Sequence, residues 1–106
     1  MGNVKTESHL RYIDVDVIIT ETPHAEASIH RNHIIQHEVC TTGIVLFDND
    51  KCGVSYNIRF VHDRTIETAS KLRSGDKIHV DMGRFDKRRG RNETDFIVKK
   101  YTLLKN

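Results

Sequence analysis

The sequence has no tryptophan, one proline and two cysteines among 106 residues. Two cysteines are too few for the disulfide framework of a small secreted domain. Cys40 and Cys52 also lie at unequal distances from an expected turn, so we expect no bridge between them and a reducing compartment. No apolar run approaches the length of a membrane span, and the first residues lack the apolar stretch of a secretory signal, so we expect no membrane association.

The net charge of the chain is also small. Seventeen Lys and Arg residues against 15 Asp and Glu residues give a formal net charge of +2. Any affinity for phosphate must therefore come from local clusters of cations rather than from their sum. The length suits one compact domain, and 37% hydrophobic residues suffice for one small core. We expect residues 1–8 to be a disordered N-terminus and residues 9–106 to form a single domain.

Alternating apolar and polar residues predict five strands. The expected strands lie near residues 10–20, 34–47, 54–60, 78–82 and 96–104. In the fourth of them, Ile78, Val80 and Met82 are expected to point into the core. The second strand is expected to bend at a bulge near Gly43.

The connections are predicted from turn residues and from a change of period. Residues 22–32 contain the proline and several small or polar residues, which predicts a loop, and residues 48–51 predict a turn. Ile66, Ala69 and Leu72 recur every three residues, which predicts a short helix. We expect Asp63 to cap this helix and Ser74-Gly75 to end it.

This order of elements predicts an all-β fold. Three strands, a short helix and two further strands match a five-stranded Greek-key OB-fold barrel with one short helix between strands 3 and 4. Closing the sheet removes its edges, and the helix plugs one open end of the barrel. An α+β sandwich built from the same elements is the alternative.

Three segments of the second half carry a family resemblance: SYNIRFV, LRSGDKIHVDMGRF and DFIVKKYTLL. Together they resemble the single-stranded-DNA-binding protein family of bacteria and mitochondria over about half of the chain. In that family a Gly-Asp-basic turn starts the fourth strand and a leucine pair ends the last one. Gly75-Asp76-Lys77 and Leu103-Leu104 match these positions. The resemblance implies an OB fold that binds single-stranded DNA.

The chain departs from that family in three ways. It lacks the tryptophan on which the family often stacks bases, and its turn over residues 48–51 is short and acidic where the family has a longer basic finger. It also ends at Asn106, directly after the fifth strand, whereas bacterial members carry a tail with an acidic tip that recruits partners. The resemblance therefore implies a tail-less variant, like primosomal replication proteins and the small subunits of telomere-capping complexes.

Cations gather between the fourth and fifth expected strands. These cations are Arg84, Lys87, Arg88, Arg89 and Arg91. Asp86 is the one acidic residue among them. Lys and Arg bind the phosphates of a single strand with release of counterions, which gives affinity without reading sequence. This loop borders the nucleic-acid groove of OB folds, so we predict that it binds nucleic acid. A merely solvated hairpin tip is the alternative.

Five further residues are candidates for binding. Phe85 is predicted either to stack on a base or to close the end of the barrel. Asn57 and Arg59 are expected to project from the outer side of the third strand, and Lys51 to extend that track. Tyr12 lies on the polar side of the first strand.

Catalytic and metal-binding patterns find little support. His24, His30, His33 and His37 are crowded together, but no cysteine pair completes a zinc site, so we interpret them as surface residues. Asp14 and Asp16 lack a third carboxylate for Mg²⁺. The sequence contains no phosphate-cradling loop and no nucleophile motif, so we predict no enzyme and no cofactor.

The sequence thus predicts a single-stranded-DNA binder with little sequence preference that acts in DNA replication or recombination. We expect it to form a homo-oligomer or to pair with another OB-fold subunit. We expect it in the cytoplasm, at the nucleoid or in the cytoplasm of a host cell, with an organelle or the nucleus as alternatives. An OB-fold protein-interaction subunit of a replication or telomere complex is the alternative function. RNA in place of DNA is a second alternative.

Overall fold

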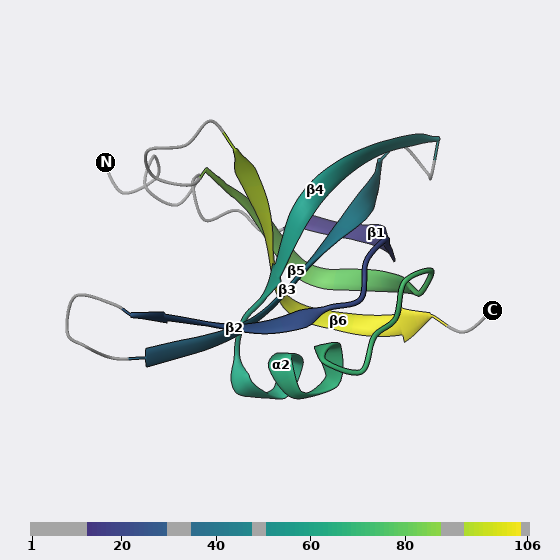
Figure 1. The fold of residues 1–106 in the computed structure, drawn as a ribbon. Helices are drawn as coiled ribbons and strands as arrows, with labels where there is room; N and C mark the ends of the chain where they lie inside the picture. Colours follow the sequence, from purple (N-terminus) through teal and green to yellow (C-terminus); the bar gives the residue numbers. More distant parts are fainter. Residues whose placement is uncertain (1–12, 30–34, 48–50, 88–92, 105–106) are drawn as a thin grey trace.

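The computed structural model describes residues 13–29, 35–47, 51–87 and 93–104, which form six strands and one helix (Figure 1). The helix α2 (Asp63–Ala69) lies between β4 and β5 in the chain. The strands are β1 (Ile13–Ile19), β2 (His24–Ile29), β3 (Ile35–Phe47), β4 (Cys52–Phe60), β5 (Lys77–Lys87) and β6 (Thr94–Leu104).

Five of these strands close into a barrel. The sheet order is β1-β5-β6-β4-β3, and β3 pairs back onto β1. All of these pairs are antiparallel except β4 with β6, which is parallel. This is the closed Greek-key arrangement expected of an OB fold, with the helix between the third and fourth barrel strands, so the predicted fold is confirmed.

The loop predicted over residues 22–32 is wrong for residues 24–29, which form β2. This strand pairs with residues 35–40 of β3, from His24 opposite Cys40 to Ile29 opposite Ile35. The pair projects from the barrel as an arm, here called the β2–β3 arm (Figure 1). β1 pairs with β3 only from Gly43 onward, so the earlier residues of β3 have unpaired backbone groups on that edge. Hydrogen bonding to these groups makes residues 24–29 a strand, although the His-Ala-Glu-Ala-Ser segment has a weak intrinsic strand propensity.

Gly43 is needed for barrel closure rather than for a bulge. The register between β3 and β4 runs without a shift from Val39–Phe60 to Phe47–Cys52, so the predicted bulge is wrong. Gly43 instead pairs on both sides, with Tyr56 of β4 and with Ile19 of β1. A Cβ at this position would lie 2.9 Å from the Cγ1 atom of Val17 and 3.0 Å from the carbonyl oxygen of Ile18.

The helix is shorter than predicted. Its N-cap is His62, with φ at 77°, so Asp63 is the first helical residue and not the cap. It ends at Ala69, because Leu72 turns into the core instead of continuing the helix. Gly75 takes the expected left-handed conformation, with φ at 97°, in the turn before β5, and its N–H donates to the carbonyl of Ile19.

The core fills the barrel and is closed by α2 at one end. Its buried side chains come from all five barrel strands, with Ala69 and Leu72 below them. Met82 was expected among them but is 38% exposed, because the β5–β6 register shifts on both sides of this residue. Such irregularities reverse the face to which the following side chains point.

Substituting Gly43 with alanine tests the closure. Gly43→Ala should lower the free energy of unfolding by about 1–3 kcal/mol, since the added Cβ overpacks the contact between β1 and β3. Urea unfolding followed by circular dichroism measures this change. Ser55→Ala, an exposed position on β4, serves as the control and should change stability little. Equal stability of the two variants would show that the contact between β1 and β3 at Gly43 accommodates a Cβ atom, and would contradict this account of the closure.

Candidate nucleic-acid interface

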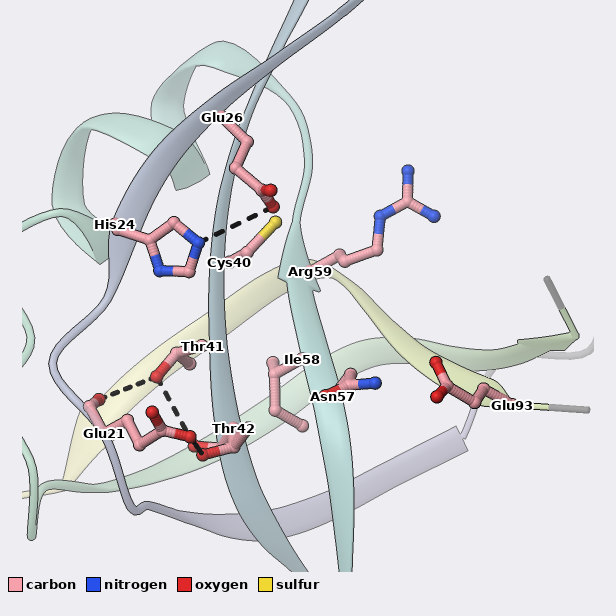
Figure 2. Close-up of a pocket in the computed structure, with 10 residues that line it drawn as sticks. All are labelled: Glu21, His24, Glu26, Cys40, Thr41, Thr42, Asn57, Ile58, Arg59 and Glu93. Atoms are coloured by element: carbon pink, nitrogen blue, oxygen red, sulfur yellow. Dashed lines mark hydrogen bonds and ion pairs between the residues drawn. The ribbon is translucent and has the colours of Figure 1, made fainter. Parts of the chain in front are cut away.

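A groove of about 310 Å³ lies on the outer face of β3 and β4 (Figure 2). One side is formed by the β2–β3 arm and the loop before it, and the other by Glu93, next to the start of β6. A second hollow adjoins it and shares Thr42, Asn57 and Glu93. The corresponding face and its flanking loops bind oligonucleotides in OB folds, so this groove is the candidate interface.

The walls of the groove are acidic. Glu21 and Glu26 line one side and Glu93 the other, and the cationic candidates among the lining residues are Arg59 and His24. His24 lies with its Nε2 atom 3.7 Å from a carboxylate oxygen of Glu26. The carboxylates of Glu21, Glu26 and Glu93 repel phosphates, so the groove itself does not attract a polyanion.

Arg59, a predicted binding residue, is held by two carboxylates. Its Nε and Nη2 atoms donate to Glu38 at 2.9 Å and 2.5 Å, and its Nη1 atom lies 3.6 Å from Asp95. The hydrogen bond to Glu38 raises the pKa of Arg59 above its usual value, although burial acts in the opposite direction. Asp95 is fully buried and Glu38 nearly so, whereas the Arg59 side chain is 23% exposed. A phosphate would have to compete with both carboxylates for this guanidinium.

Asn57 is the predicted residue that lies most openly on the groove. It is exposed on β4 opposite Thr42 and lines both hollows. Thr42 donates to a carboxylate oxygen of Glu21 at 2.6 Å, and Thr41 donates to the backbone carbonyl of Glu21 at 2.7 Å. These bonds fix the Glu21 wall against β3, so the groove is shaped before any ligand arrives.

Cys40 lies in the groove as a protonated thiol. Burial raises its pKa to about 12, with further contributions from a hydrogen bond to Glu26 and from the charges of Glu26 and Glu38. The thiol is therefore a hydrogen-bond donor at neutral pH and not a nucleophile. Both cysteines are free, and Cys52 is exposed.

The predicted basic cluster is described only in part. Lys87 is exposed at the end of β5, opposite Thr94 of β6. Arg84 is half-buried, and its Nε atom is buried without a hydrogen-bond partner. Residues 83–87 and 94–98 form a second arm, here called the β5–β6 arm, which in Figure 1 rises toward the upper left. Arg88, Arg89, Arg91 and the candidate Tyr12 lie outside the described residues.

Phe85 closes the end of the barrel opposite α2. Its ring centroid lies 4.8 Å from those of Tyr56 and Phe96 and 6.2 Å from that of Phe47. These contacts favour the predicted role of Phe85 in closing the end of the barrel over its predicted role in stacking on a base. Lys51 is exposed in the turn before β4, where its N–H donates to the carbonyl of Phe47.

The acidic walls of the groove are not among the residues predicted from the sequence. Glu26 faces the groove only because β2 forms and pairs it opposite Glu38, and nothing in the local sequence predicts this strand.

Asp16, considered above as a magnesium ligand, instead accepts a 2.7 Å hydrogen bond from Nδ1 of His79, which raises the pKa of this histidine. Within the described residues, no group of three His, Cys, Asp or Glu side chains could hold a metal ion. The described helix is too short and too polar to cross a membrane.

Comparison with known proteins finds a structural likeness only. No family model matches the chain, and no curated protein matches its sequence. Among solved structures, the chain is similar to a small single-stranded DNA-binding protein from Streptomyces coelicolor, with a TM-score of 0.57 and 16% identity over 88% of this chain and 91% of that chain. At this identity the likeness shows the OB fold that the strand order also shows.

Removing the Arg59 side chain should destabilise the protein strongly. Arg59→Ala removes the hydrogen-bonded cation from the nearly buried carboxylate of Glu38, and such a loss typically costs about 3–5 kcal/mol. Asn57→Ala, two residues away on the same face, should cost far less. Urea unfolding measures both, and equal losses would contradict the structural role assigned to Arg59.

The two thiols should differ in reactivity. With iodoacetamide at pH 8, Cys52 should be alkylated in the folded protein, whereas Cys40 should not, because its raised pKa and burial keep it protonated and covered. Mass spectrometry of tryptic peptides measures the labelling. A Cys52→Ser variant should take up no label until urea unfolds it. Rapid labelling of Cys40 in the folded variant would contradict this account of the groove.

Proposed function

We propose that this protein binds single-stranded DNA with little sequence preference. The observation that carries the proposal is a cluster of cations at the end of β5. Lys87 is exposed and Arg84 half-buried there, and the sequence continues with three arginines before Glu93, which lines the groove. Loops at this position bind oligonucleotides in OB folds. The structurally similar Streptomyces protein is named as a single-stranded DNA-binding protein, which supports the same function.

The charges suggest how a strand would lie. Phosphates gain from the cations of the β5–β6 arm and lose near Glu21 and Glu26, and both effects act within a screening length of about 8 Å at physiological salt. A strand with its backbone along the β5–β6 arm and its bases turned toward β3 and β4 satisfies both conditions. Asn57, Ser55 and Thr42 then offer hydrogen-bonding groups to base edges.

Binding of this kind needs no catalytic group and no cofactor. It serves DNA replication and recombination, in which single strands are exposed, and these are the processes we propose, in the cytoplasm or nucleoid. Pairing with a second copy or with another OB-fold subunit would lengthen the bound strand.

A second candidate function follows from the acidic walls. A groove lined by Glu21, Glu26 and Glu93 complements a cationic segment of a protein better than it complements a phosphate. As an interaction subunit of a replication or telomere complex, the protein would bind nucleic acid weakly or not at all. The salt dependence of strand binding separates the two functions.

Neutralising the arginines between β5 and β6 tests the proposal. Arg88→Gln, Arg89→Gln and Arg91→Gln together should weaken binding to an oligo-dT of about 30 nucleotides. They should also reduce the slope of log K against log salt by about 2, because each phosphate contact on a single strand contributes about 0.7. Fluorescence anisotropy at several salt concentrations measures both quantities.

Arg73→Gln is the control for this test, since Arg73 is exposed in the turn after α2, away from the β5–β6 arm. It should leave the slope nearly unchanged. If the wild-type protein binds no strand, or binds without salt dependence, the proposal fails and the interaction-subunit function is favoured.

A further inference from the structure

A second groove, of about 690 Å³, lies between the start of α2 and the strands β5 and β6. Its charge is opposite to that of the groove on β3 and β4. Arg64, Lys99 and Lys100 line it, against one carboxylate, that of Asp63. The nearby Asp81 lies 3.8 Å from His79 and accepts a hydrogen bond from Thr102, and it does not line the groove.

The fold holds this groove in shape. Thr65 of α2 donates a 2.7 Å hydrogen bond to the backbone carbonyl of Lys99, which ties the helix to β6. Lys100 lies opposite Met82 in the β5–β6 register, and the register shifts around Met82 turn its thioether outward. Met82 is consequently 38% exposed and lines the groove with Lys99 and Lys100.

We propose that this groove, here called the α2–β6 groove, is a second contact site for the same single strand. The inference rests on the proposed function and extends it. Arg64 and Lys100, both exposed, bind phosphates, and Met82 packs against the face of a base, since a polarizable thioether makes favourable contacts with aromatic rings. Charge complementarity selects a polyanion here, whereas it disfavours one against the walls formed by Glu21 and Glu26.

The groove is within reach of a strand bound at the β5–β6 arm. β6 begins at the arm with Thr94 and reaches the groove at Lys99 and Lys100. At about 3.3 Å per residue, the six steps from Thr94 to Lys100 span about 20 Å. Single OB folds occupy about 4–16 nucleotides, so a long strand covers both sites and a very short one covers only the arm.

The test removes charge from the groove and varies the length of the strand. The double variant Arg64→Gln/Lys100→Gln is titrated with fluorescent oligo-dT of about 30 nucleotides and of about 6 nucleotides. For the long strand we expect weaker binding at low salt and a slope of log K against log salt reduced by about 1.4, which is two contacts of about 0.7 each. Binding of the short strand should be unchanged.

Two further variants sharpen the result. Lys71→Gln/Arg73→Gln removes the same charge from exposed positions just after α2, outside the groove, and should leave both strands unaffected. Met82→Ala should weaken binding of the long strand and leave its salt slope unchanged, because an apolar contact releases no counterions. All of the charge substitutions are at exposed residues, and a thermal melt verifies that the variants are folded.

The outcomes separate this inference from the proposed function. If the groove variant binds the long strand with an unchanged slope, while neutralising Arg88, Arg89 and Arg91 lowers that slope, the second site is refuted and the proposed function stands. An equal loss for both strand lengths also refutes a second site that only long strands reach. If the wild-type protein shows no salt-dependent binding of either strand, the proposed function fails, and the inference fails with it.

Discussion

The pairing of β3 with two strands along one edge is the constraint on which the rest of the molecule depends. Residues 43–46 of β3 bond to β1 and close the barrel, while residues 35–40 bond to β2 and form the β2–β3 arm. Gly43 permits the close approach of β1 at the point where the barrel closes. The same strand therefore provides a wall of the core, a floor of the candidate groove and an arm beside it.

This geometry separates the charges of a nearly neutral chain. Glutamates of the β2–β3 arm and of the loop before it collect on the outer face of β3 and β4, where Arg59 is held by Glu38 and Asp95. Cations line the groove beside α2 instead, and in the sequence they are frequent between β5 and β6. A chain with a net charge of +2 thus carries one acidic and one cationic groove. Under the proposed function, this separation would attract the backbone of a single strand to one groove and keep it from the other.

The sequence predicted the barrel because apolar and polar residues alternate where a strand lines the core, as Tyr56, Ile58 and Phe60 do on β4, whereas Val54 at the start of that run is 41% exposed. It failed where the decisive contacts are distant in the chain. β2 forms because an edge of β3 is available, Met82 turns outward because the β5–β6 register shifts, and Glu38 and Asp95 reach Arg59 from two other strands. Of the candidate site, Asn57 is exposed as its position on the third expected strand suggested, and Lys87 as its position in the expected hairpin tip suggested. The contacts of Arg59 and Phe85 depend on partners that no local pattern reveals.

The central claim is that a single strand lies with its backbone on the β5–β6 arm and its bases over β3 and β4. Amide NMR spectra recorded during titration with oligo-dT test it most directly. The account predicts that the largest shift changes occur at Lys87, Thr94 and Asn57, with little change at Asp16 and His79 on the outer face of β1 and β5. Changes confined to the Asp16–His79 face, or none at saturating strand, would contradict it.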